Sequence, residues 1–241
     1  MTTEPLHLHR DHLSVAEVDL HDPYVTANLG LFIIHNVLRR NLASCARHAK
    51  CLATSNFEPF LVYTRYTLQV LEDHLRCAED ISLPVYADRD PRFSALMDAH
   101  KQVRKEILPL QSLLATPSWK LAAVLPQIAD SLAILQEKLY PQFDAVEDVI
   151  NQTARQIPLE MVKAMDARLE ECRRQNSRKQ GTVWAAFYLT RALSPEEREL
   201  GALRMPKHKL EGMLTAGELQ FRRWLYGYDF GHLPSGFGAE I

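Results

Sequence analysis

Glycine is almost missing from most of this chain. Gly30 is the only glycine in the first 180 residues, and the other eight follow residue 180. Folds rich in strands need many turns, and turns need glycine, so residues 1–180 are predicted to be helical. The chain also has no run of eighteen apolar residues, and its start is polar. We therefore expect a cytoplasmic protein that does not cross a membrane.

Strong charge and familiar catalytic motifs are missing too. The net charge is −2, so we expect neither nucleic acid nor an anionic membrane surface as a partner. No Walker loop, GxGxxG, GxSxG or HExxH motif occurs. The four cysteines form no CxxC pair and no zinc-ribbon spacing, so they are predicted to be reduced thiols: Cys45, Cys51, Cys77 and Cys172.

What the chain does have is helical periodicity. Apolar residues recur with that period over about residues 24–53, 57–82, 92–114 and 126–156. Pro84 is expected to end the second helix, Pro126 to lie in the first turn of the fourth, and Pro141 to kink it. Four such helices with modest loops predict an all-α, antiparallel four-helix bundle over residues 24–156.

The flanking regions differ from the bundle. Residues 1–23 form a polar N-terminal arm, and its histidines are predicted to lie in a disordered stretch rather than a metal site: His7, His9 and His12. Residues 157–241 are predicted to form a C-terminal extension packed on the bundle. It contains a fifth helix, a short apolar sixth helix at VWAAFYLTRAL, and an irregular end rich in glycine and aromatic residues.

Polar residues interrupt the apolar face of every bundle helix. They are His35 in the first helix, His74 in the second, His100 and Arg104 in the third, and Gln142 and Glu147 in the fourth. Burying polar groups is unfavourable unless they pair or bind something. A single histidine of this kind is most often a hydrogen-bonded core residue. Four helices that each contribute at a similar depth instead predict a functional centre.

These segments resemble the metal-ligand segments of the hemerythrin-like (HHE cation-binding) family, in its fungal form. In that family the second helix carries H-x-x-x-E-E, with a proline five residues after the second acid. Here His74, Glu79 and Pro84 keep this register, but Ala78 replaces the first, bridging glutamate. The first helix of the family contributes one histidine, which His35 matches.

The third and fourth helices depart further from the family pattern. The family's H-x-x-x-H reads His100 and Arg104 here, and its H-x-x-x-x-D or E reads Gln142 and Glu147. The resemblance thus implies a hemerythrin-like bundle whose di-iron ligand set has lost three members. Arg104 is a permanent cation that opposes a bound metal, and we expect it to be buried and paired with Glu147 or with a bound anion. A di-iron oxygen carrier is therefore not expected.

The favoured hypothesis is an enzyme that needs no metal or other cofactor. A small, largely apolar organic substrate would occupy the former iron cavity, with His35, His74 or His100 as acid or base near neutral pH. Arg104 and Gln142 would hold a developing oxyanion, and Glu147 would complete the catalytic set. Isomerisation, dehydration or cyclisation in secondary metabolism would suit such a centre.

Two alternatives remain. His35, His74 and Glu147 could bind one iron as a two-histidine, one-carboxylate set, which would make the protein a mononuclear non-haem oxygenase. The bundle could also be non-catalytic, with its polar centre serving ligand binding or structure. In the favoured hypothesis the substrate contacts four predicted residues, the last two of which close the open end of the bundle: Ala78, Gln142, Trp224 and Tyr228.

Overall fold

The protein is all-α throughout the part of the chain that the structure describes. The computed structural model describes residues 5–11, 13–51, 57–117, 120–181, 188–189, 192–202, 211–212 and 215. Most of these residues are helical, and no strand occurs among them. The fold class predicted from the scarcity of glycine is confirmed.

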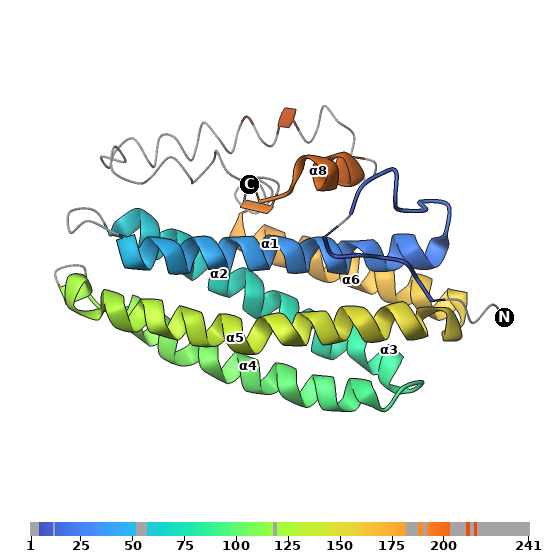
Figure 1. The fold of residues 1–241 in the computed structure, drawn as a ribbon, viewed down its shortest axis with the longest axis horizontal. Coiled ribbons are helices and arrows are strands. Elements are labelled where there is room, and N and C mark those ends of the chain that lie inside the picture. Colours follow the sequence, from blue (N-terminus) through green and yellow to red (C-terminus); the bar gives the residue numbers. More distant parts are fainter. Residues whose placement is uncertain are drawn as a thin grey trace.

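Four long helices build the body of the molecule. They are α1 (Pro23–Cys51), α2 (Glu58–Cys77), α4 (Arg92–Leu114) and α5 (Leu121–Thr153). Successive helices run in opposite directions and are joined at the ends of the molecule (Figure 1). Both α1 and α4 pack against α2 and α5, so the four helices close a ring around one interior. None of the described helices combines the length and apolarity that a membrane span requires.

The prediction that Pro84 ends the second helix is wrong, because the chain stays helical through this residue. A π-helix, η1 (Ala78–Ser82), follows α2 and leads into the short helix α3 (Leu83–Ala87). The Leu83 N–H donates to the Ala78 carbonyl five residues earlier. Proline has no N–H to donate, and its ring collides with the carbonyl of a regular α-turn. A wider turn absorbs this defect and lets the helix continue.

The fourth bundle helix starts earlier than predicted. Leu121 and Leu125 are buried and extend its apolar stripe toward the N-terminus. Pro126 therefore lies inside α5 rather than in its first turn, and Pro141 lies inside it as well. The helix passes into a 3₁₀ turn, η3 (Ala154–Gln156), at its C-terminal end.

A further helix, α6 (Leu159–Gln180), crosses the bundle against α1, α2 and η1, and confirms the predicted fifth helix. The early glycine contributes to this packing. A Cβ atom at Gly30 would lie 3.2 Å from Nη2 of Arg173, closer than such atoms normally approach. Gly30 thus allows the Arg173 guanidinium to lie against α1.

Cys77 and Cys172 form a disulfide that joins the end of α2 to α6, with their Cα atoms 6.7 Å apart. The prediction of reduced thiols is wrong for this pair. The two cysteines are 95 residues apart in sequence, and only the packing of α6 brings them within bonding range. Cys45 is a free, buried thiol, and burial raises its pKa to about 11.

The N-terminal arm lies against the bundle instead of being disordered, as far as residues 5–11 and 13–22 are concerned. Buried and exposed residues alternate here: Leu6 and Leu8 are buried, whereas His7 and His9 are exposed. The Leu6 N–H donates to the Asn151 carbonyl at 2.7 Å. The alternation of apolar and polar residues gives this extended segment one face to bury, and the sequence prediction overlooked it.

The C-terminal extension adds one helix that the sequence did not predict, α8 (Pro195–Ala202), which lies beside α1 (Figure 1). The Ser194 side chain accepts a hydrogen bond from the Glu197 N–H at 3.1 Å and so caps its first turn. The predicted sixth helix lies mostly outside the described residues, as do Trp224 and Tyr228.

The interior contains two large apolar clusters, one toward each end of the bundle. Phe32, Phe93 and Ile150 belong to the cluster that also includes α3 and part of α6. Leu38 and Leu71 belong to the other, which fills the opposite half. On each of the four long helices, the boundary between the two clusters falls at the level of the predicted functional residues.

Candidate functional site

A layer of polar side chains separates the two apolar clusters. Each bundle helix supplies at least one member, and all except the partly buried His74 are buried: His35 from α1, His74 from α2, His100 from α4, and Gln142 and Glu147 from α5. A polar layer in a dry interior must satisfy its hydrogen bonds internally or through a ligand. The partners of each group therefore indicate what the layer does.

Three of these residues form a hydrogen-bonded chain. Nδ1 of His35 lies 2.7 Å from Oε1 of Glu147, and Nε2 of His35 lies 3.0 Å from Nε2 of His74. An ionised carboxylate only accepts, so His35 donates from Nδ1 and must accept at Nε2. His74 then donates from Nε2, which leaves its Nδ1 as the basic nitrogen at the end of the chain.

Phe143 packs against both imidazoles of this hydrogen-bonded chain. Its ring stacks on that of His35 with centroids 3.8 Å apart, and it meets the His74 ring edge-on at 5.8 Å. Phe143 comes one turn before Glu147 on α5, so both residues face α1. The two imidazoles are thereby fixed at nearly a right angle to each other.

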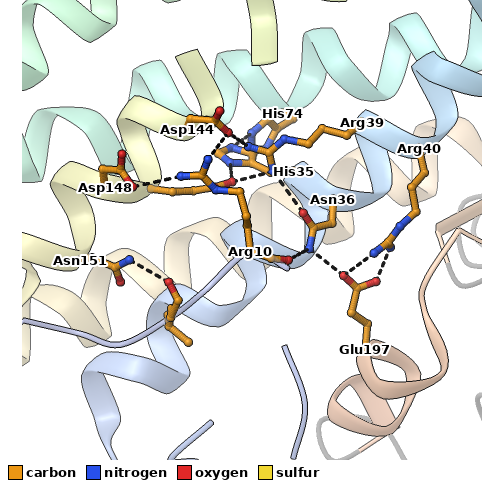
Figure 2. A network of polar contacts seen from close by, with 12 residues as sticks. Arg10, His35, Asn36, Arg39, Arg40, His74, Asp144, Asp148, Asn151 and Glu197 are labelled. Atoms are coloured by element: carbon orange, nitrogen blue, oxygen red, sulfur yellow. Dashed lines mark hydrogen bonds and ion pairs between the residues drawn. The ribbon is translucent and has the colours of Figure 1, made fainter. Parts of the chain in front are cut away.

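Two arginines contact Glu147, the first residue of this hydrogen-bonded chain. Arg39 Nη1 donates to Oε1 of Glu147 at 2.9 Å, and Arg10 Nε lies 2.9 Å from Oε2. Both guanidinium groups also contact Asp144 on the outer side, at 2.6 and 2.8 Å. Figure 2 shows this arrangement, in which Arg10 from the arm and Arg39 from α1 converge beside His35.

Burial dominates the ionisation of the layer. It lowers the pKa of His35 and of His74 well below the ordinary 6.5, and that of His100 to about 4. Burial also raises the pKa of Glu147, while the hydrogen bond and charge of Arg39, followed by Arg10, oppose the increase. The three imidazoles are therefore neutral near pH 7. The two guanidinium groups favour the ionised form of Glu147 and so oppose the effect of burial.

Arg104 does not pair with Glu147, so that prediction is wrong. Its Nη1 donates instead to Oε2 of Glu79 at 2.7 Å, and its side chain remains 35% exposed. Arg104 lies one turn after His100, but it is directed toward η1 rather than toward α5. Arg10 and Arg39 take the place beside Glu147 that had been expected for Arg104.

The layer's other two members are less well satisfied. Gln142 donates from Nε2 to the Leu96 carbonyl at 2.9 Å. Its Oε1 has no partner among the described residues, and neither ring nitrogen of His100 has one. Gln142 thus has a free carbonyl oxygen in this arrangement, and its expected role in holding an oxyanion stays a prediction. Ala78, the first residue of η1, is buried one turn after His74, the last residue of the hydrogen-bonded chain.

The donor atoms do not fit the single-iron alternative as arranged. His35 and His74 point their Nε2 atoms at each other, but Glu147 lies behind the opposite nitrogen of the His35 ring. The three donors therefore do not surround one point. Nor do the described residues contain any other group of three or more histidine, cysteine or acidic side chains arranged to hold a metal ion.

A separate pocket lies on the outer face of α2. It has a volume of about 600 Å³, and most of the residues that line it have polar side chains: Val62, Arg65, Tyr66, Gln69, Asp73, Arg76 and Lys179. None of the predicted site residues lines it. The polar layer and this pocket are thus distinct features of the molecule.

Comparison with known proteins finds a relative that matches most of the chain. No family model matches the chain, and no solved structure matches it either. The chain is 42% identical over 226 residues to "Xanthocillin biosynthesis cluster protein F" of Aspergillus fumigatus. The match covers 92% of this chain and the whole of the relative. The chain belongs to the family of this protein.

Sequence reasoning missed several residues of the site in this family member. Arg10, Arg39 and Asp144 were not predicted, although together they determine the charge around Glu147. The first two lie far apart in sequence and show no periodicity that marks them. Buried Glu197 of α8 was also missed. It accepts a hydrogen bond from Asn36, next to His35, at 2.8 Å and forms an ion pair with Arg40.

Proposed function

We propose that this protein is an enzyme of secondary metabolism that converts a small organic molecule by acid/base chemistry without a metal. The chain from Glu147 through His35 to His74 carries the proposal, because it ends in a neutral, partly exposed imidazole. The name of the A. fumigatus relative assigns that protein to a biosynthesis cluster, which supports a biosynthetic role here.

In this mechanism His74 is the catalytic base. Its Nδ1 takes a proton from the substrate, and its Nε2 proton shifts to Nε2 of His35 across their 3.0 Å contact. Glu147 stabilises the imidazolium that results, through the hydrogen bond to Nδ1 of His35. The reverse shift returns the proton to another position of the substrate. Return to carbon completes an isomerisation, and return to a departing hydroxyl completes a dehydration.

We also propose that the bundle is hemerythrin-like. Support comes from the common level of His35, His74 and His100 on three helices, with Gln142 and Glu147 at that level on the fourth. The lost ligand positions explain why such a bundle would work without iron. Protein purified without chelators should contain well under one iron per chain, and two tightly bound irons per chain would contradict the proposal.

The test compares two histidines of the bundle in a producing strain that lacks the protein. Complementation with His74→Gln should leave the substrate unconverted, because glutamine cannot accept the proton; product should fall at least about 100-fold. His48→Gln is the matched control, since His48 is buried on α1 but takes no part in the chain. Metabolite analysis by mass spectrometry measures both.

A non-catalytic bundle is the second candidate, and one observation favours it. Phe143 fills space against both histidines of the chain, as a side chain of a structural core would. In that case His74→Gln would keep full product formation while lowering the melting temperature by several degrees, since it would leave a buried group unsatisfied. The complementation experiment thus separates the two candidates.

A further inference from the structure

Hydrogen-bond acceptors without partners gather on the α4 side of the polar layer. In the described part of the chain, Oε1 of Glu79, Oε1 of Gln142 and both ring nitrogens of His100 are buried and unpartnered. His100 is 1% exposed and Gln142 is 6% exposed. A buried polar atom without a partner is unfavourable. Four such atoms on one side of the polar layer point to a ligand.

Two contacts place these atoms along two turns of α4, with His100 in the middle. Gln142 donates to the carbonyl of Leu96, one turn before His100. Glu79 accepts from Arg104, one turn after His100. Since residues four apart share a helix face, α5 and η1 bring Gln142 and Glu79 to opposite ends of the face that contains His100.

The chemistry of these atoms favours a ligand that donates hydrogen bonds. Glu79 and Gln142 can only accept at their free oxygens. His100 has no carboxylate partner among the described residues, and a buried imidazolium without one would be strongly disfavoured. A neutral imidazole offers one donor and one acceptor. The group therefore presents three acceptors and one donor, and Arg104 already balances the charge of Glu79.

We propose that this acceptor group, defined as Glu79, His100 and Gln142, binds a hydroxyl or N–H group of a neutral substrate. The inference rests on the proposed function, because it assigns the substrate class of the same centre. It replaces the expected oxyanion role of Gln142 and Arg104. Carboxylates and phosphates are excluded, since their oxygens would face three acceptors.

Three small probes test the substrate class without any turnover. Benzyl alcohol carries a hydroxyl donor on an apolar ring, benzyl methyl ether lacks the donor, and benzoate carries an anion. Binding is followed by NMR through the ¹⁵N shifts of the His100 ring. Benzyl alcohol should move these shifts in a saturable manner, with a dissociation constant at least about tenfold lower than for the ether or benzoate.

Variants show where the discrimination arises. Gln142→Leu and His100→Leu should each remove the preference for the alcohol, monitored for the latter by the shifts of His74. Gln102→Leu, at an exposed position on the same helix, should preserve it. Equal or tighter binding of benzoate would overturn the inference, and so would binding of no probe, which would mean that water alone serves these atoms. In either case acid/base catalysis by His74 would remain open, because its own test measures product.

Discussion

At the scale of single residues, the charge of Glu147 is the centre of the site. The carboxylate is almost fully buried, yet it contacts His35, Arg39 and Arg10 at 2.7 to 2.9 Å. Burial alone would favour its protonated form, and a protonated Glu147 could not stabilise a cationic His35. The two arginines thus favour the ionised carboxylate that this role needs, while their positive charges also lower the pKa of His35.

Replacement of Arg39 should make this balance visible. In Arg39→Met we expect the pKa of Glu147 to rise further, because the largest influence that opposes burial is removed. The ¹³C shift of the Glu147 carboxyl reports this pKa by NMR titration. Arg47→Met is the control, since Arg47 is exposed on the same helix. An unchanged Glu147 pKa in Arg39→Met would mean that Arg10 alone keeps the carboxylate ionised.

At the scale of elements, α6 and the N-terminal arm hold the bundle helices from outside. α6 is joined to α2 by the disulfide, three residues after His74. The arm inserts Arg10 between Asp144, Glu147 and Asp148 of α5. Both elements therefore act on segments that carry the proton chain, although neither contributes an imidazole to it.

Loss of the disulfide should lower the free energy of unfolding without removing any residue of the polar layer. The link closes a loop of 95 residues, for which the loss of chain entropy predicts about 3–5 kcal/mol. Cys172→Ser should lower the free energy of unfolding by that amount in urea denaturation, and added reductant should have no further effect on the variant. Thiol titration of the denatured, unreduced protein should find two of the four cysteines free. Four free thiols would show that no disulfide forms.

At the scale of the whole molecule, two apolar halves meet at a polar layer. Global stability then depends on pH through the layer's neutral histidines. The pKa of His100 is about 4 when folded, against an ordinary 6.5. Between about pH 6.5 and pH 4, His100 is protonated in the unfolded chain but neutral in the folded chain. The free energy of unfolding therefore falls as pH falls toward 4.

The size of this effect can be measured by difference. By linkage, this difference between the two pKa values of His100 lowers the free energy of unfolding by about 3 kcal/mol from pH 7 to pH 4. His100→Gln should therefore show a shallower decline of unfolding free energy between pH 7 and 4 than the parent protein. Urea denaturation at several pH values gives both curves. Parallel curves would mean that His100 is not held neutral by burial.

Much of the fold and half of the site were predictable from the sequence. Periodicity located the four long helices, and the interrupted apolar faces located His35, His74, His100, Gln142 and Glu147, because both signals are local. The partners of these residues were not predictable. Arg10 reaches Glu147 across more than half of the chain, and Arg104 pairs with Glu79 because a π-helix redirects the segment after Cys77.

That π-helix also bears on how the family can vary. A π-turn holds one residue more between its hydrogen-bonded groups than an α-turn. A relative that lacked one residue between Ala78 and Ser82, and also the proline at position 84, could therefore continue as an unbroken α-helix, without a new loop. Alignments of the family should then show a one-residue gap here, inside a helix, in members that lack this proline. Such members would have Leu83–Ala87 turned by about 100° relative to α2.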